Sequence, residues 1–272
     1  MELAERRVRF GRQMARSAGV SEDGEIARVF GSVLRETFVG SPPWRIFAGD
    51  GEGQPISDPA LLYQDVLVQL KSESAINNGQ PSLHALCLAA LRITPGETAV
   101  HVGAGTGYYT AMLGLLVGDR GRAEAYEIEG DLAARAMENL REMPWMHVHA
   151  GSGTAEPLPA CDVLYVSAGA TDPLKMWLDA LRMGGRLLFP LTPDEGYGAM
   201  LLVTRMEERY AARFLCGAKF VGCEGARDRA MAGRLTRCFG NGRAAEVKSL
   251  RRDSSPDESA WCSGEGWWLS TR

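Results

Sequence analysis

Short apolar runs alternate with segments of helical spacing through residues 80–204. Residues 99–102 form a short apolar run that predicts a buried strand, and apolar residues at helical spacing follow over 108–117. A second short strand is predicted over 123–126. Strands that alternate with helices in this way predict an α/β fold with a doubly wound, mostly parallel sheet.

The same alternation predicts the other elements of this core. Two segments after it, 200–206 and 211–221, are expected to close the sheet as an antiparallel pair. A turn is expected at Gly184 and Gly185, immediately before the last parallel strand. The remaining predicted elements are strands at 146–149, 162–167 and 186–190 and helices at 81–91, 131–141 and 173–181.

The two ends of the chain have other patterns. A helix is predicted over 3–18, Ser21 opens a second one, and the Gly-, Pro- and Asp-rich stretch 40–59 predicts an irregular connection. A helix near 228–239 and a strand around Val247 are expected in the tail. The chain should therefore divide into a helical and loop-rich N-terminal segment (1–60), an α/β core (61–222) and an α+β C-terminal extension packed on the core (223–272).

Composition is that of an enzyme domain. The chain has 272 residues, and 45% of them are hydrophobic, which suffices for a large packed core. No apolar run approaches the roughly 18 residues of a membrane span, and the charged N-terminal helix does not resemble a signal peptide. The six cysteines form no C-x-x-C pair, which predicts reduced thiols and a cytoplasmic location.

Two further patterns bear on nucleic-acid and metal binding. Residues 205–252 carry an excess of basic residues, but no aromatic residues are interleaved with the arginines, so a solvated helix face is favoured over a nucleic-acid surface. His147 and His149 alternate on a short predicted strand without a third ligand at suitable spacing, so no metal is expected.

A glycine turn joins the strand at 99–102 to the following helix. Its spacing is G-x-G-x-G at Gly103, Gly105 and Gly107, and Glu127 ends the next strand. Glycines allow the backbone to approach a ligand closely, and an acid at this place accepts hydrogen bonds from ribose hydroxyls. The dinucleotide fingerprint G-x-G-x-x-G places its third glycine one residue later. The turn therefore favours S-adenosylmethionine, which carries no phosphate, over a nicotinamide dinucleotide or a turn without a ligand.

Several motifs in order make the chain resemble one family. Over residues 36–222 it resembles the protein-L-isoaspartate O-methyltransferases, a family of class I methyltransferases that use S-adenosylmethionine. The motifs that carry the resemblance are Glu36-Thr37-Phe38-Val39 (R-E-x-F-V), Tyr63-Gln64-Asp65 (Y-x-D), Gln80-Pro81-Ser82 (S-Q-P), 101–108 (E-I-G-T-G-S-G-Y), Gly151-Ser152-Gly153 (G-D-G), the strand and small-residue turn 162–170, 184–191 (G-G-R-L-v-x-P-V) and Lys219-Phe220-Val221 (R-F-V).

The resemblance implies a seven-stranded, Rossmann-like methyltransferase sheet and a cofactor site. At two of its positions the chain departs from the family pattern, because His101 replaces the acid before the first glycine and Ser152 replaces the acid of G-D-G. The residues assigned to S-adenosylmethionine are Gln80, His101, Gly103, Ala104, Gly105, Gly107, Tyr108, Glu127, Ile128, Gly151, Ser152, Gly153 and Ser167.

The resemblance also places the acceptor. A carboxylate of a peptide or protein would attack the sulfonium methyl group, and it needs no general base because it is already ionised at pH 7. Asn77, Asn78, Gly79 and Ser82 are the catalytic candidates. Asn77-Asn78-Gly79 stands where the family has T-I-S, so that Gly79 occupies the position of its proposed active-site serine.

Other functions remain open at this point. The chain could be a small-molecule O- or N-methyltransferase of a biosynthetic pathway, or a catalytically silent module that binds S-adenosylmethionine. A nucleic-acid N6-adenine methyltransferase is disfavoured because no Asn/Asp-Pro-Pro-aromatic run follows the strand at 162–167.

A few side chains allow two interpretations. His84 could touch the substrate or be a buried polar neighbour, and Tyr63 and Asp65 could shape the substrate entrance or make structural loop contacts. The tail tryptophans 261, 267 and 268 could form a lid or partner surface, but aromatic residues in a tail usually dock it onto the core.

Overall fold

The computed structural model describes residues 2–48, 53–71, 75–252 and 255–272, in two compact units. The first unit comprises residues 1–97 and 104–151, and the second comprises 98–103 and 152–272. The three-part division expected from the sequence stays a prediction.

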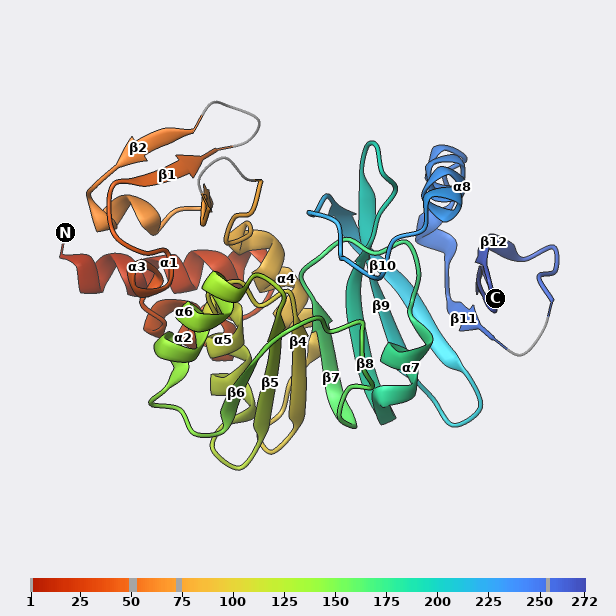
Figure 1. Cartoon of the computed structure of the whole chain (residues 1–272), viewed down its shortest axis with the longest axis horizontal. Helices are drawn as coiled ribbons and strands as arrows, with labels where there is room; N and C mark the ends of the chain where they lie inside the picture. Colours follow the sequence, from red (N-terminus) through yellow and green to blue (C-terminus); the bar gives the residue numbers. More distant parts are fainter. Residues whose placement is uncertain (1, 49–52, 72–74, 253–254) are drawn as a thin grey trace. The chain divides into compact units, whose positions relative to one another are not determined.

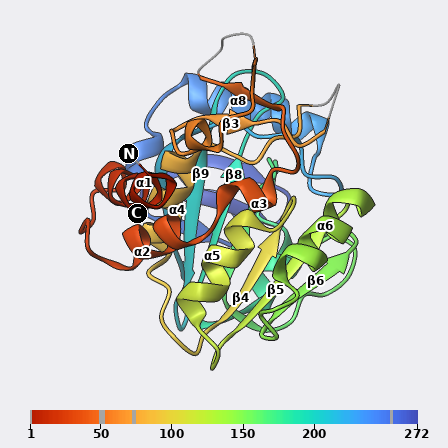
Figure 2. The same cartoon turned by 90° about the vertical axis from the view of Figure 1, so that its left-hand side faces the viewer.

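The first unit begins with two helices that pack against each other. Helix α1 (Leu3–Ser17) and helix α2 (Glu25–Ser32) lie side by side in Figure 2. Their close approach depends on Gly11, because a Cβ atom there would lie 2.2 Å from the carbonyl oxygen of Ala27. Helix α1 confirms the helix expected over 3–18. The second expected helix also forms, but Ser21 does not open it, because α2 begins at Glu25 with Gly24 as its N-cap.

Among its described residues, the first unit also contains four further α-helices and a pair of parallel strands. Strands β5 (Arg122–Glu127) and β6 (Met146–Ala150) pair in parallel, with Glu127 opposite Ala150. They confirm the strands expected at 123–126 and 146–149. Helix α5 packs against β5, and α6 packs against both strands. The helices are α3 (Arg35–Phe38), α4 (Pro81–Leu91), α5 (Tyr108–Val117) and α6 (Gly130–Leu140), with a 3-10 turn at Pro59–Leu62.

The irregular connection expected over residues 40–59 is partly wrong. Strand β1 (Trp44–Phe47) pairs with β2 (Gln54–Ile56) on one side and with β3 (Leu67–Val68) on the other, all antiparallel. Pro42 and Pro43, just before β1, are residues typical of a loop and so gave no indication of this small sheet. Its β1 partner strands are only two and three residues long, too short for a periodic signal. Residues 49–52, within the same stretch, lie outside the described residues.

The second unit is built on a mixed sheet. Strands β4 (Thr98–Val102), β7 (Cys161–Val166) and β8 (Leu181–Leu191) pair in parallel in the order β4-β7-β8. Strand β9 (Gly198–Arg205) continues the sheet antiparallel to β8. Strand β10 (Tyr210–Ala218) then pairs antiparallel with β9, so the antiparallel closing pair expected from the sequence is confirmed (Figure 1).

The glycine pair before the last parallel strand does not form the expected turn. Strand β8 already begins at Leu181, and Gly184 and Gly185 lie inside it. The pairing with β7 shifts register between Cys161 and Val163, and Gly184 has φ +77°. The two glycines therefore form an irregularity within the strand. Helix α7 (Lys175–Ala180) is accordingly shorter than the helix expected over 173–181.

The C-terminal extension lengthens the sheet of the second unit. Strand β11 pairs with β10 and with β13, and β13 pairs with β12, all antiparallel. Trp267 and Trp268 are 5% and 3% exposed, so these tryptophans dock the tail instead of forming a lid. The extension contains helix α8 (Arg229–Gly240), a 3-10 turn (Ala244–Glu246), β11 (Ser249–Arg251), β12 (Ala260–Gly264) and β13 (Trp267–Ser270).

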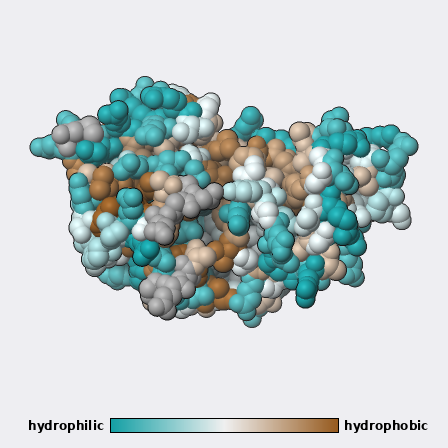
Figure 3. All heavy atoms as spheres, turned by 90° about the horizontal axis from the view of Figure 1, so that it is seen from above, coloured by the Kyte–Doolittle hydropathy of each residue, from teal (hydrophilic) through white to brown (hydrophobic). Residues whose placement is uncertain are grey.

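Hydrophilic residues make up much of the face drawn in Figure 3, with apolar atoms showing between them. Large apolar side chains that are well exposed include Val8, Met183 and Tyr197. Among the described residues, no helix combines the length and apolar character that crossing a membrane requires.

Candidate active site

The glycine turn leads directly into helix α5. Gly105 has φ +57° and Gly107 has φ +91°, conformations that side chains other than glycine adopt only with strain. The Gly107 N–H donates to the carbonyl oxygen of Ala104 at 2.9 Å. A Cβ atom at position 107 would also lie 3.1 Å from Cδ1 of Leu140 on α6. Glycine is therefore required here by backbone conformation and by packing.

Glu127 places a fixed carboxylate at the carboxyl end of β5. Its side chain is 6% exposed, and Oε2 accepts from the Gly105 N–H at 2.5 Å. Oε1 accepts from the backbone N–H of Glu129 at 3.0 Å. The next side chain, Ile128, is 45% exposed although it is apolar. An oriented hydrogen-bond acceptor thus lies next in sequence to an uncovered apolar surface.

In the second unit, His101 lies on β4 beside the loop that follows β7. Its Nε2 is 2.9 Å from the Ser167 hydroxyl, and its ring stacks on Tyr165. Burial lowers the pKa of His101 to about 3, so the imidazole is neutral at physiological pH. The residue that replaces the family's acid therefore contributes hydrogen bonding without a charge.

The first glycine of the turn lies close to the same loop. Gly103 has φ +76°, and a Cβ atom there would lie 3.3 Å from the carbonyl carbon of Ser167. The Ser167 N–H donates to the carbonyl oxygen of Val102 at 2.8 Å. Within the second unit, the structure thus brings together His101, Gly103 and Ser167, three of the predicted cofactor residues.

The Gly151-Ser152-Gly153 segment is held by its neighbours in each unit. In the first unit, the Gly151 N–H donates to the Glu127 carbonyl oxygen at 2.9 Å. In the second, the Ser152 hydroxyl lies 2.7 Å from that of Thr154 and accepts from the Thr154 N–H. Trp177 Nε1 donates to the Gly153 carbonyl oxygen at 3.0 Å. The Ser152 side chain thus stabilises the turn itself.

The side chains of the acceptor-side candidates Asn77 and Asn78 are engaged in hydrogen bonds within the first unit. Asn77 Oδ1 accepts from the Gly79 N–H at 2.8 Å, which fixes the loop as a tight turn. Asn78 is 7% exposed, and its Oδ1 accepts from Val68 N–H and from Arg35. The four catalytic candidates stay predictions, but the two asparagine side chains serve the loop's own conformation.

Asp65 connects two further predicted residues in the first unit. The Ser82 hydroxyl donates to Asp65 Oδ2 at 2.7 Å, and Gln80 Nε2 donates to the same oxygen at 2.9 Å. Ser82 N–H donates to Asp65 Oδ1. Asp65 therefore fixes the start of α4, which supports its structural interpretation. Tyr108, assigned to the cofactor, is 2% exposed and offers little side-chain surface.

His84 occupies the space that a side chain at position 79 would fill. Gly79 has φ +74°, and a Cβ atom there would lie 2.1 Å from His84 Nε2. His84 is 2% exposed and stacks on Tyr109, with ring centroids 3.6 Å apart and planes at 4°. The His84 imidazole can therefore occupy this space only because residue 79 has no side chain. The sequence analysis did not predict this steric relation.

Arg35 is a residue that the sequence analysis did not identify. Its side chain is fully buried and donates to the carbonyl oxygens of Leu62, Gln64 and Val66 and to Asn78 Oδ1. One guanidinium thereby ties the segment 62–66 to the Asn77-Asn78-Gly79 loop. The available signal was the arginine of R-E-x-F-V, which precedes Glu36 in this chain.

Glu36 lies in a neighbouring polar cluster. Its carboxylate accepts from the Tyr63 hydroxyl and pairs with Arg7. Burial and the adjacent carboxylate raise the pKa of Tyr63 to about 12, so the phenol stays protonated and acts as a donor. Tyr63 also accepts from the backbone N–H of Arg35 at 3.1 Å. Its contacts are therefore structural loop contacts.

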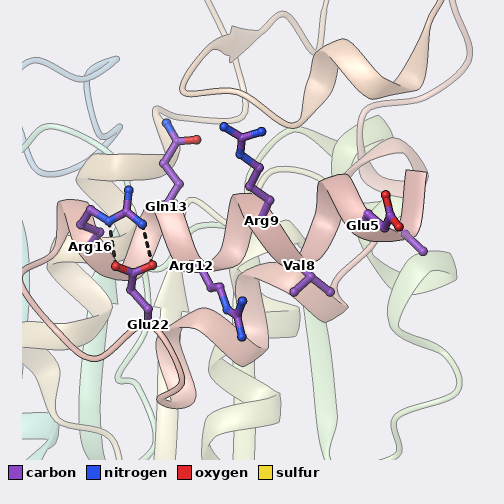
Figure 4. Close-up of a pocket in the computed structure, with 8 residues that line it drawn as sticks. Glu5, Val8, Arg9, Arg12, Gln13, Arg16 and Glu22 are labelled. Carbon is purple, nitrogen blue, oxygen red and sulfur yellow. Dashed lines mark hydrogen bonds and ion pairs between the residues drawn. The ribbon is translucent and has the colours of Figure 1, made fainter. Parts of the chain in front are cut away.

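A surface hollow lies on the exposed side of α1 (Figure 4). Arg16 and Glu22 form an ion pair at its edge, with a distance of 2.6 Å. None of the predicted site residues lines it. Among the described residues, no group of three or more His, Cys, Asp and Glu side chains is arranged to hold a metal ion.

Comparison with known proteins identifies the family. The sequence model of protein-L-isoaspartate(D-aspartate) O-methyltransferase matches residues 13–227. Protein-L-isoaspartate O-methyltransferase 1 of Arabidopsis thaliana is 36% identical over 186 residues, which cover 64% of this chain and 72% of that protein. The enzyme of Rhodopseudomonas palustris (strain ATCC BAA-98) is 30% identical over 191 residues, covering 68% of this chain and 85% of the relative.

Solved structures confirm the expected α/β methyltransferase fold. A protein-L-isoaspartate O-methyltransferase aligns with a TM-score of 0.68 at 20% identity, over 93% of this chain and 74% of that one. A putative Plasmodium falciparum homologue, solved in complex with S-adenosyl-L-homocysteine, aligns with a TM-score of 0.61 at 19% identity, over 79% and 98% of the two chains. The sequence match spans most of this chain, which therefore belongs to the protein-L-isoaspartate(D-aspartate) O-methyltransferase family.

Proposed function

We propose that this chain transfers a methyl group from S-adenosylmethionine to a carboxylate of isoaspartyl residues in peptides or proteins. The observation that carries the proposal is the pairing of Glu127 with the glycine turn, in a chain of this family. A buried carboxylate at the end of β5 offers an acceptor for ribose hydroxyls. Three glycines with positive φ keep the adjacent backbone free of side chains.

Each unit, taken by itself, contains residues whose chemistry suits S-adenosylmethionine. In the first unit, Glu127 supplies an oriented acceptor and the exposed side chain of Ile128 supplies an apolar surface for a flat base. In the second, neutral His101 and the Ser167 hydroxyl supply uncharged hydrogen-bonding groups. We assign the cofactor to these residues, together with Gln80, Gly103, Ala104, Gly105, Gly107, Tyr108, Gly151, Ser152 and Gly153.

Methyl transfer to a carboxylate requires no general base from the protein. When bound, the cofactor supplies an electrophilic methyl group on a sulfonium sulfur. The acceptor carboxylate is already ionised at pH 7, because carboxyl pKa values lie near 4. The protein has to align the two reactants and exclude water, and alignment alone can contribute about 7–11 kcal/mol to lowering a barrier.

Gly79 leaves the acceptor loop without a side chain at the position where the family has serine. It has no side chain, and the loop backbone is fixed by Asn77 and by the Arg35–Asn78 hydrogen bond. We propose that the acceptor is held by polar backbone groups of this loop. An isoaspartyl peptide, which carries an extra backbone methylene and a free carboxylate, would be recognised by the shape of the loop.

Methyl transfer from labelled S-adenosylmethionine tests the proposal. The acceptors are an isoaspartyl peptide and its aspartyl twin, which differ only in the linkage at one residue. Base-labile label on the isoaspartyl peptide alone is the expected result, because a methyl ester hydrolyses in alkali. Label on neither peptide, in a preparation that binds the cofactor, would contradict the proposal and favour a small-molecule acceptor or a silent binding module.

A further inference from the structure

The C-terminal extension is hydrogen-bonded to the loop that follows β7. Trp267 Nε1, on β13, donates to Asp172 Oδ1 at 2.8 Å. Asp172 Oδ2 accepts from the Thr171 hydroxyl at 2.7 Å. The hydroxyl oxygen of Thr171 in turn accepts from the backbone N–H of Asp228 at 2.9 Å. All of these residues belong to the second unit, and Trp267 lies outside the 13–227 match to the family.

The surroundings of this chain of hydrogen bonds hold it in one geometry. Thr171 is fully buried and Trp267 is 5% exposed. Gly264 leaves room for the indole, because a Cβ atom there would lie 2.3 Å from Trp267 Nε1. Asp228 is the N-cap of α8, and its side chain accepts from the Met231 N–H. Both the helix and the hairpin of the extension are therefore attached to Thr171 and Asp172.

The segment that leads into the extension holds the same loop from further points. Cys223 N–H donates to the Gly169 carbonyl oxygen at 2.8 Å, and Gly169 N–H donates to that of Val221 at 2.8 Å. Arg227 Nη1 also donates to Gly169 at 3.1 Å and to the Thr192 hydroxyl at 3.0 Å. The loop from Ser167 to Asp172 thus lacks freedom to move without breaking several bonds.

The loop begins with a predicted cofactor residue. Ser167, whose hydroxyl lies 2.9 Å from His101 Nε2, precedes Thr171 by four residues. It follows β7 at the carboxyl end of a parallel strand, the edge at which α/β proteins bind ligands. A shift of Thr171 would therefore be transmitted through a short, tightly bonded loop to Ser167.

We propose that Trp267 is a positioning residue for the cofactor site, and that the extension exists to fix the 167–172 loop through Asp172 and Thr171. The inference rests on the proposed function, because it takes Ser167 to contact S-adenosylmethionine. It assigns a role to residues 228–272, which the family match does not cover.

Two matched substitutions test the proposal in the full-length chain. Trp267→Phe removes the N–H that Asp172 accepts and retains an aromatic ring. Trp261→Phe is the control, because Trp261 Nε1 donates to the Gly242 carbonyl oxygen at 2.8 Å within the extension itself. Affinity for S-adenosylmethionine is measured by calorimetry, KM and kcat by methyl transfer, and folding by thermal unfolding. Amide hydrogen exchange over 167–172 reports on the loop without a cofactor.

Trp267→Phe should weaken S-adenosylmethionine binding about threefold to tenfold, the range set by one hydrogen bond, and should raise its KM with little change in kcat. Exchange over 167–172 should accelerate in this variant alone. Trp261→Phe should bind the cofactor as the wild type does, even if its unfolding temperature falls equally.

A second pair of substitutions, at Thr171, tests the same hydrogen-bonded chain without changing Trp267. Thr171→Ser retains the hydroxyl and should retain affinity, whereas Thr171→Val should weaken binding as Trp267→Phe does. Equal affinity and exchange in wild type and Trp267→Phe, or equal losses in the two tryptophan variants, would overturn the inference. A wild type that binds no S-adenosylmethionine would instead refute the proposed function, and the exchange data would still decide whether Trp267 fixes the loop.

Discussion

Replacing Gly79 by serine should destabilise the fold, although serine is the residue that the family motif carries at this position. Gly79 has φ +74°, and left-handed backbone costs a non-glycine residue about 1–2 kcal/mol. The new Cβ atom would also lie 2.1 Å from His84 Nε2 and 2.8 Å from its Cδ2. His84 cannot withdraw easily, because it is buried and stacked on Tyr109.

The size of the effect follows from these two contributions. Overpacking a filled core costs about 1–3 kcal/mol, so Gly79→Ser should lower the free energy of unfolding by about 2–5 kcal/mol in total. Gly242→Ser is the matched control, because Gly242 also has φ +74° but nothing lies within 4 Å of its Cβ position. Gly242→Ser should therefore lower the free energy of unfolding only by the cost of the left-handed backbone, about 1–2 kcal/mol.

Urea unfolding of the wild type, Gly79→Ser, His84→Ala and the double variant measures the steric contribution to the loss of stability. In a double-mutant cycle of Gly79→Ser and His84→Ala, removing the imidazole should relieve the clash and give a favourable coupling of about 1–3 kcal/mol. The reasoning is refuted if Gly79→Ser destabilises no more than Gly242→Ser, or if the coupling is zero within error.

The remaining predictions concern other residues of the site. Burial holds the pKa of His101 at about 3, below the 6.5 of an exposed histidine, so the unfolded state takes up a proton first as pH falls. The stability that His101 contributes above pH 6.5 is therefore lost as pH falls toward 3, by up to about 1.4 kcal/mol per pH unit. His101→Gln should have a flatter stability profile than the wild type in guanidinium unfolding between pH 7 and 4, and identical slopes would contradict the neutral buried state. Arg35→Lys keeps the charge but removes the planar guanidinium that donates to three carbonyl groups. It should lower the free energy of unfolding, measured in urea, by about 3 kcal/mol. The control Arg28→Lys, at an exposed position, should change it by less than about 0.5 kcal/mol. Gly105→Val should weaken S-adenosylmethionine binding, because φ is +57° there and a β-branched residue adopts that conformation only with strain; unchanged calorimetric affinity would refute the assignment.

Features with local signals could be predicted from the sequence. Strand β4 is a short, mostly apolar run that ends just before Gly103, and the G-x-G-x-G spacing located the turn between β4 and α5. Glu127 could be located because it ends β5, the first strand after that turn and helix α5. These elements depend on residues that are close in the sequence, which periodicity and motif spacing report directly.

Features that depend on three-dimensional geometry or on residues distant in the sequence could not be predicted. The steric exchange between Gly79 and His84 requires the φ angle of one residue and the rotamer of the other. Arg35 reaches Val66 across 31 residues, and Trp267 reaches Asp172 across 95, with no periodicity to signal either pair. The β1–β3 sheet was missed for a different reason, because its strands are too short to show alternation.

Calorimetric titration of S-adenosylmethionine into wild type and Glu127→Gln tests the central claim most directly. The account predicts binding to the wild type and a loss of about tenfold to a hundredfold in Glu127→Gln, because hydrogen bonds to a charged carboxylate contribute about 1.5–3 kcal/mol each. Glu129→Gln is the control, since Glu129 lies two residues further along and pairs with Lys71. Equal affinity of Glu127→Gln and wild type would contradict the assignment of this carboxylate to the cofactor.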